Sequence, residues 1–268
     1  MAQLNGPLQF TGSIGGIRCY YDKRLKRYIL STKGGAKKEH ILNSAAFKRT
    51  RENMSEFAGC SKWAAQLRKS LASLIHLFQG TYFPMLVSTG KAIQKHDTDH
   101  IKGQRSIKLS RVAKLIEGLN FNSYHPFDQV LSNRYTIAFS DDKTTATLSM
   151  HGFISHAHLK WPNRISVYRI ALVMAQIADY DFNKESDEYQ PVVPGLSQRS
   201  VCSTTEWLQD STDPIEINLS ASFAEPALQQ PGTTVVVAIG IELLTQPTNP
   251  AYLNTSGSGT MKIAECFV

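Results

Sequence analysis

Hydrophobic and polar residues follow three different patterns along the chain. Over residues 8–31, Ile17, Cys19 and Tyr21 alternate with basic and aromatic positions, which predicts a β-hairpin or small meander. From Asn43 to Phe78, apolar positions recur every three or four residues, which predicts one long helix. Beyond residue 131, short apolar runs separated by turn residues predict strands. We therefore expect an α+β protein with a helical segment between two β-rich parts.

The long helix is predicted to begin near Asn43 and Ser44, which are favourable N-cap residues, and to end by Gly80. At 1.5 Å per residue, its roughly 35 residues would extend about 50 Å. Its apolar stripe consists of Phe47, Thr50, Met54, Phe57, Ser61, Ala64, Arg68, Leu71, Ile75 and Phe78. Shorter helices are predicted at residues 82–95, 110–119 and 126–131, with a polar loop at residues 96–107.

The part that follows residue 131 is predicted to be an antiparallel β-sandwich of jelly-roll or immunoglobulin-like type. Its strands are expected at residues 135–139, 145–150, 165–178, 201–207, 215–223, 234–244 and 261–267. The prolines at 191, 194, 214, 226, 231, 247 and 250 fall between these runs, where they interrupt no strand ladder. The sequence thus divides into a β-hairpin arm (1–42), a helical segment (43–131) and a β-sandwich domain (132–268).

Charge is divided unequally between the two ends of the chain. Residues 1–118 hold 21 Lys and Arg against 7 Asp and Glu, whereas residues 119–268 hold 8 against 15. The densest basic cluster is a predicted hairpin turn flanked by tyrosines, with Lys23, Arg24, Lys26 and Arg27. The densest acidic cluster is a predicted loop with Asp179, Asp181, Glu185, Asp187 and Glu188. We expect these nine residues to contact a neighbouring protomer or, for the basic ones, a polyanion such as nucleic acid; plain solvation is the remaining alternative.

The sequence contains no convincing catalytic or metal-binding pattern. The glycines at 12, 15 and 16 lack the Lys-Ser/Thr pair and the strand-to-helix context of a phosphate-binding loop. The polar run at 96–100, with two histidines and two aspartates, has no further ligand at a suitable spacing, so an exposed loop is expected there. The four cysteines are scattered, which favours free buried thiols in a reducing compartment. We expect no enzymatic activity, cofactor or metal.

No segment is expected to enter a membrane or direct secretion. The longest nearly apolar runs, 170–178 and 235–244, are far shorter than the roughly 18–20 residues that cross a bilayer. The N-terminal residues lack the basic start and apolar stretch of a secretory signal. The expected location is therefore the cytoplasm.

Several short motifs resemble one family of proteins. Phe-Thr-Gly-Ser-Ile-Gly at 10–15, Thr-Lys-Gly-Gly at 32–35 and Arg-Thr-Arg-Glu-Asn at 49–53 are similar to the N-terminal pattern of a family of uncharacterised bacterial proteins. The resemblance extends over most of the chain and is weakest at 82–130. It implies no catalytic residues, and it associates the chain with bacterial cytoplasmic fibrils.

These patterns together favour a non-enzymatic structural protein that self-assembles into cytoplasmic filaments, tubes or a lattice. The basic half of each protomer would contact the acidic half of the next, and such a heterologous contact propagates unless it closes into a ring. The alternative is a nucleic-acid-binding protein of phage origin.

Overall fold

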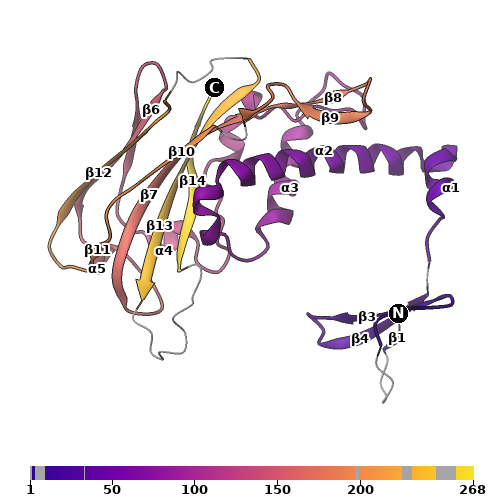
Figure 1. Cartoon of the computed structure of the whole chain (residues 1–268), viewed down its shortest axis with the longest axis horizontal. Coiled ribbons are helices and arrows are strands. Elements are labelled where there is room, and N and C mark those ends of the chain that lie inside the picture. Colours follow the sequence, from indigo (N-terminus) through magenta and orange to yellow (C-terminus); the bar gives the residue numbers. More distant parts are fainter. Residues whose placement is uncertain (1, 4–9, 33, 197–198, 225–230, 246–257) are drawn as a thin grey trace. The chain divides into compact units, whose positions relative to one another are not determined.

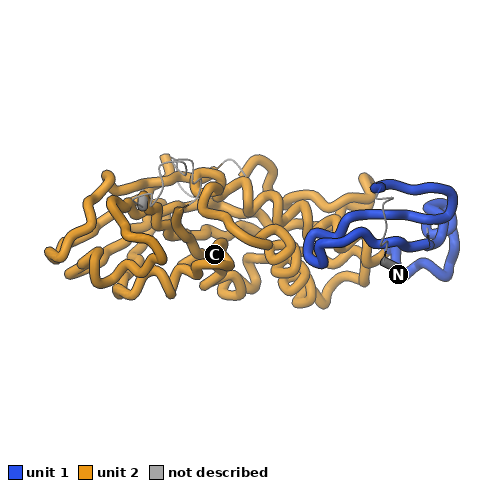
Figure 2. The backbone as a smooth tube through the Cα atoms, turned by 90° about the horizontal axis from the view of Figure 1, so that it is seen from below, with its two compact units in different colours: residues 1–51 blue, residues 52–268 orange. Residues whose placement is uncertain are grey.

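The computed structural model describes residues 2–3, 10–32, 34–196, 199–224, 231–245 and 258–268 (Figure 1). The chain forms two compact units, residues 1–51 and residues 52–268, which are coloured separately in Figure 2. Mixed α+β structure with antiparallel sheets is confirmed. Among the described residues, no helix combines the length and the apolar character that crossing a membrane requires.

The N-terminal unit contains a small antiparallel sheet followed by short helices. Its strands are β1 (Ala2–Gln3), β2 (Gly12–Ile14), β3 (Ile17–Asp22) and β4 (Arg27–Thr32), arranged in the order β1-β4-β3-β2. Helix α1 (Lys38–Asn43) and the 3-10 turn η1 (Ala45–Phe47) lead into the long helix α2 (Lys48–Ser70). The Arg51 guanidinium donates to the carbonyls of Ile41 and Ser44, both at 2.7 Å, and so ties the end of α1 to the start of α2.

The predicted 35-residue helix is wrong in its length and in its buried face. Helix α2 has 23 residues; Leu71 leaves helical geometry, and the chain continues as the 3-10 helix η2 (Ala72–Leu77). Met54 and Phe57 of the predicted stripe are 53% and 62% exposed. The buried residues of α2 are Glu56, Gly59, Cys60, Trp63, Ala64, Gln66, Leu67 and Ser70. The buried face therefore includes a charged residue, which periodicity assigns to the solvent.

The region after α2 contains one regular helix and several short turns. The helix predicted at 82–95 is confirmed as α3 (Tyr82–Gln94). The helix predicted at 110–119 is wrong, because only the 3-10 turns η3 (Leu109–Arg111) and η4 (Ala113–Ile116) form there. Tertiary hydrogen bonds replace helical ones there: the backbone N–H of Ser110 donates to Asp179, and the backbone at 118–121 pairs with strand β14 (Gly259–Phe267). Helix α4 (Phe127–Val130) and, further along, α5 (Ser155–His158) have four residues each.

Two larger antiparallel sheets and a two-stranded hairpin, β8 (Tyr180–Asn183) with β9 (Glu188–Pro191), complete the described part of the second unit. Of the two sheets, the larger one has the order β10-β7-β13-β14, with β11 also on β7, and the smaller one has the order β12-β6-β5. Their strands are β5 (Thr136–Phe139), β6 (Thr145–Phe153), β7 (Ile165–Ala178), β10 (Ser200–Thr204), β11 (Leu208–Gln209), β12 (Ile215–Ser222), β13 (Thr233–Thr245) and β14 (Gly259–Phe267). The outer edge of β14 is covered, because the backbone of residues 118–121 bonds to Met261 and Ile263.

The larger sheet is buried on both faces. On one face, Ala171 and Val173 belong to a core that they share with Trp63, Leu67 and other helical residues. On the other face, alternate residues of the same strands pack against the smaller sheet in a second core. Burial of both faces explains why β7 and β13 are nearly continuous apolar runs rather than alternating ones.

Candidate functional site

The four predicted basic contact residues lie together at the turn between β3 and β4, with Arg27 as the first residue of β4. Lys23, Arg24, Lys26 and Arg27 are all exposed. Asp22 shapes the turn by accepting the backbone N–H groups of Arg24 at 2.9 Å and Leu25 at 3.0 Å. These hydrogen bonds, that of Leu25 above all, lower the pKa of Asp22. The cations are therefore held in one defined loop that is free to contact another molecule.

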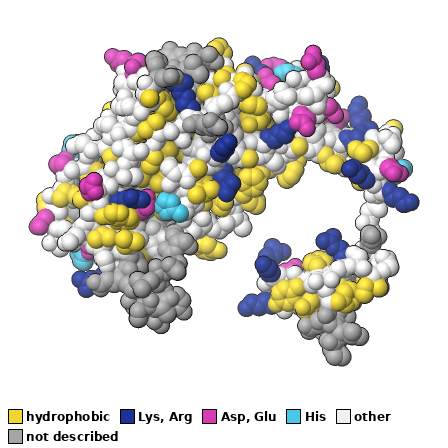
Figure 3. Space-filling view, in the orientation of Figure 1, with side chains coloured by type: hydrophobic (Ala, Val, Ile, Leu, Met, Phe, Trp, Pro, Cys, Tyr) yellow, Lys and Arg dark blue, Asp and Glu magenta, His cyan; other side chains and the backbone are white. Residues whose placement is uncertain are grey.

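Aromatic and aliphatic side chains accompany these cations on the same sheet, with Tyr21, Leu25 and Tyr28 at the turn and with Ile14 and Ile17 at the opposite end of β3. The rings of Tyr21 and Tyr28 meet edge to face with centroids 5.1 Å apart. Ile14, Ile17 and Leu25 are 65%, 49% and 48% exposed. Figure 3 shows hydrophobic side chains between Lys and Arg side chains on this unit. The surface thus combines apolar area with positive charge.

The N-terminal sheet has almost no core of its own. Among the residues of β2, β3 and β4, only Cys19 and Ile29 are buried. Residues 1–51 carry 11 Lys and Arg against 2 Asp and Glu, which leaves residues 52–268 with 18 against 20. The net positive charge of the chain therefore comes from the N-terminal unit, because in the second unit acidic residues slightly outnumber basic ones.

The predicted acidic loop is in fact an antiparallel hairpin, formed by β8 (Tyr180–Asn183) and β9 (Glu188–Pro191). Asp181, Glu185 and Asp187 are exposed on it. Glu188 is also exposed, but it pairs with Lys62 of α2 at 2.7 Å. We call the exposed acids Asp181, Glu185 and Asp187 the acidic patch.

Asp179 does not belong to this surface, so its expected contact role is wrong. The residue is buried, and its carboxylate accepts the backbone N–H of Ser110 at 3.0 Å and also the hydroxyl of that residue. Burial raises the pKa of Asp179, and the bonds from Ser110 oppose the rise. Asp179 anchors the segment around residue 110 and is unavailable to a partner.

A buried ionic network, which the sequence does not predict, joins α2 and α3 to the loop at 97–107. Glu56 is fully buried and accepts Arg105 Nε at 2.7 Å, Arg105 Nη2 at 2.8 Å and the N–H of Gly103 at 2.9 Å. The Lys91 ammonium donates to the same carboxylate. Burial opposes the ionisation of Glu56, but these hydrogen bonds outweigh it and lower its pKa to about 2.

Around the network lie other polar groups that are also bonded within the chain. Gln94 Nε2 donates to the carbonyl of Arg105 at 2.7 Å, and the hydroxyl of Tyr189 donates to the same carbonyl at 3.0 Å. Burial raises the pKa of the Cys60 thiol to about 11. A carboxylate with a pKa of about 2 is a weak base, and a thiol with a pKa of about 11 is protonated at neutral pH. The arrangement therefore fits the role of a structural anchor.

The loop at 96–107 is not simply exposed. Asp97 is buried and accepts His100 Nδ1 at 2.8 Å and the backbone N–H groups of Asp99 and Ser106. Across the described ranges, no group of three His, Cys, Asp or Glu is placed to hold a metal ion. All four cysteines are free; Cys202 is exposed, and Cys19, Cys60 and Cys266 are buried.

Comparison of the chain with models of known protein families and with curated proteins found no match.

Proposed function

We propose that the protein is a non-enzymatic structural protein that self-assembles in the cytoplasm into a filament, tube or lattice. The N-terminal sheet of one protomer docks on the acidic patch of the next protomer. We further propose that the two packed sheets form a β-sandwich body, of which the N-terminal hairpin and its neighbouring strands are the arm. The observation that carries this proposal is a four-stranded sheet in which Cys19 and Ile29 are the buried residues of β2, β3 and β4.

A sheet of this size needs a covered apolar face for stability. Exposed Ile14, Ile17 and Leu25 would bury their side chains only against another protein surface. A polyanion would neutralise the cations, but its phosphates would leave these three aliphatic side chains in water. The mixture of apolar area and positive charge therefore favours an acidic protein surface as the partner.

The β8–β9 hairpin supplies such a surface on the same chain. It combines the acidic patch with Val192, which is 44% exposed and directly follows β9. The hairpin has two strands, and outside the bridge between Ile107 and Tyr180 no further strand is paired with β8 among the described residues. The edge of β14 is already covered, so β8 is the better acceptor for an added strand. We assign the donor role to β2, an edge strand with three exposed residues.

The donor and acceptor surfaces lie on different parts of one chain. Such a contact is heterologous, and it continues from copy to copy unless the rotation closes a ring. Exposed ion pairs contribute little energy each. Buried apolar area and strand hydrogen bonds therefore supply the attraction, while the charges select orientation and register.

The test measures particle size by mass photometry and negative-stain microscopy across a salt series. Wild-type protein is expected to form large particles at low salt that become smaller as salt screens the contact. Reversing Lys23, Arg24, Lys26 and Arg27 to Glu should abolish them. The matched control reverses four exposed lysines of the second unit, Lys69, Lys95, Lys114 and Lys160, with the same change in net charge. A monomer under every condition, or equal loss in both variants, would overturn the proposal.

A second candidate, nucleic-acid binding, is favoured by one observation. Tyr21 and Tyr28 meet beside the basic turn, and tyrosine rings next to cations can stack on bases. Purified protein that carries nuclease-sensitive absorbance near 260 nm, with particles that vanish after nuclease treatment, would support this function over self-assembly.

A further inference from the structure

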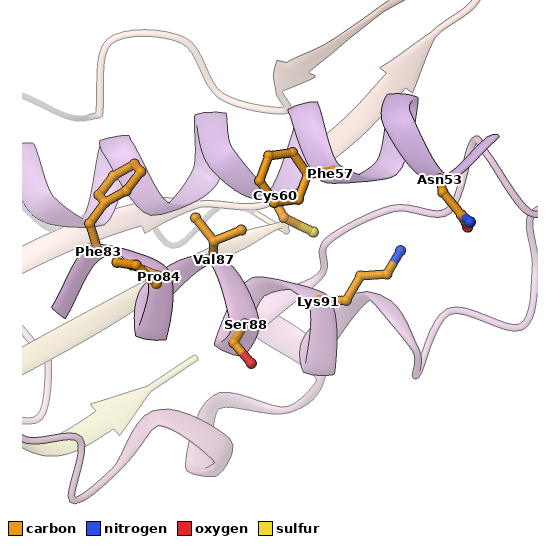
Figure 4. Close-up of a pocket in the computed structure, with 8 residues that line it drawn as sticks. All are labelled: Asn53, Phe57, Cys60, Phe83, Pro84, Val87, Ser88 and Lys91. Carbon is orange, nitrogen blue, oxygen red and sulfur yellow. The ribbon is translucent and has the colours of Figure 1, made fainter. Parts of the chain in front are cut away.

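A pocket lies between α2 and α3 in the second unit; the proposed assembly does not use it, and it shares Lys91 with the ionic network (Figure 4). Its volume is about 510 Å³, which falls within the roughly 300–1,000 Å³ typical of sites for small molecules. Phe57 from α2 and Phe83, Pro84 and Val87 from α3 supply apolar walls. Phe57 is 62% exposed and Phe83 is 37% exposed, so the walls are accessible to solvent.

The two ends of the pocket differ in polarity. Figure 4 shows Phe83 and Pro84 at one end and Lys91 and Asn53 toward the other. The amino group of Lys91 points from α3 toward α2. A ligand that lies along the pocket would therefore meet an apolar wall at one end and polar side chains at the other.

Lys91 keeps one donor for such a ligand. Its ammonium has three N–H groups, of which one bonds to Glu56 and one to Gln94 Oε1 at 3.0 Å. The third has no acceptor among the described residues, and the Asn53 amide is likewise without a partner there. The Lys91 side chain is 34% exposed, so its ammonium can reach a bound molecule.

Charge favours an anion at this end. One carboxylate, that of Glu56, accepts hydrogen bonds from two cations. Arg105 donates hydrogen bonds to both oxygens of Glu56, and its pKa is raised by these bonds and, to a smaller extent, by the charge of Asp97. Lys91 shares Glu56 with that stronger bidentate partner and has no carboxylate to itself. A second carboxylate in the pocket would give Lys91 a counter-ion of its own.

We propose that the pocket between α2 and α3 binds a monocarboxylate with an aliphatic body, its carboxylate at Lys91 and Asn53 and its chain against Phe57, Val87 and Phe83. Burial of the ligand's aliphatic chain against these walls supplies most of the affinity, since transfer of each methylene out of water is favourable. The charge-assisted hydrogen bond from Lys91 selects the head group.

The first test compares three ligands with the same ten-carbon chain and different head groups. Calorimetric titration of the full-length protein with decanoate, decan-1-ol and decylammonium at pH 7.5 separates the contribution of the alkyl chain to the affinity from that of the head-group charge. Decanoate should bind saturably below its micellar concentration, the alcohol about tenfold more weakly and the ammonium more weakly still. Equal affinities for decanoate and the alcohol, or no saturable binding of decanoate, would overturn the proposal with the wild-type protein alone.

Substitutions then locate the site. Lys91→Met should weaken decanoate binding about tenfold and abolish the preference over the alcohol, whereas Lys95→Met, an exposed lysine at the end of the same helix, should leave both unchanged. Val87→Trp should fill the pocket and weaken all three ligands. Unchanged decanoate affinity in Lys91→Met or Val87→Trp would show that the ligand binds elsewhere and would overturn the assignment. Circular dichroism of each variant confirms that it is folded.

Discussion

Replacement of Glu56 by glutamine tests the buried network that joins α2, α3 and the loop at 97–107. Glutamine keeps the size of the side chain but removes the charge that accepts hydrogen bonds from Arg105, Lys91 and the Gly103 N–H. The two cations, whose side chains are 34% exposed for Lys91 and 19% exposed for Arg105, then face a neutral amide that is itself buried. Removal of one partner from a buried ion pair typically costs about 3–5 kcal/mol.

The pKa of Glu56 gives an independent value for the same loss. It falls from 4.5 to about 2 in the folded protein, and each pKa unit corresponds to about 1.4 kcal/mol. The ionised carboxylate therefore contributes about 3 kcal/mol to the free energy of unfolding at neutral pH. Because the folded pKa is lowered, this contribution is fully present above pH 4.5 and is lost as the pH falls toward 2.

The assay is urea unfolding of wild type and Glu56→Gln, followed by tryptophan fluorescence at several pH values. We expect the variant to be about 3 kcal/mol less stable at pH 7, and the difference to narrow to about 1 kcal/mol at pH 3. The control, Glu188→Gln, removes an exposed partner of Lys62 and should leave the unfolding midpoint unchanged. Equal stability of Glu56→Gln and wild type at pH 7, or a difference that does not depend on pH, would refute this reasoning.

Three further outcomes follow from the packing. Gly59→Ala should lower the unfolding midpoint, although alanine normally favours a helix, because the new methyl would lie 2.6 Å from the Tyr189 ring; a higher midpoint would contradict this. Asp179→Asn should raise stability at neutral pH and lose that advantage in acid. Burial raises the pKa of Asp179 in the folded protein, so above this folded pKa the buried charge costs energy, which the neutral asparagine avoids. Below the pKa of the unfolded chain Asp179 is itself neutral, and the advantage disappears. Unfolding curves at pH 7 and pH 3 check this, and lower stability at pH 7 would count against it. A thiol reagent should react rapidly with Cys202 alone and with all four cysteines in denaturant; a second fast thiol in the native protein would contradict their burial.

The elements that the sequence predicts well are those whose pattern is local. Helix α3 begins with Tyr82 as predicted, and β7 has the predicted bounds, Ile165–Ala178, because a long β-branched and apolar run leaves no competing structure. The exposed basic turn could also be predicted, since a dense cluster of Lys and Arg between two strands has few places other than a hairpin end.

The parts that sequence reasoning missed depend on contacts between distant residues. Burial of Glu56 is possible because Lys91 and Arg105 donate hydrogen bonds to its carboxylate. These partners lie 35 and 49 positions later in the chain, and helical periodicity carries no information about them. One signal was present, since Glu56 lies three and four residues before Gly59 and Cys60 on the face that becomes buried. The sequence places Asp179 among the contact residues of an acidic loop because it precedes four other acids, whereas its bonds to Ser110 decide its position. The pocket is also invisible in the sequence, because α2 and α3 each supply only part of its lining.

Mixing two variants tests whether the basic turn of one protomer contacts the acidic patch of the next. One carries Glu at Lys23, Arg24, Lys26 and Arg27; the other carries Lys at Asp181, Glu185 and Asp187, which spares buried Asp179 and paired Glu188. Each variant alone presents like charges at both surfaces, whereas the mixture offers two opposite-charge contacts, one between the native surfaces and one between the reversed surfaces. We expect small particles by mass photometry for each variant alone and large particles for the mixture at low salt. Large particles for either variant alone, or small ones for the mixture, would contradict it.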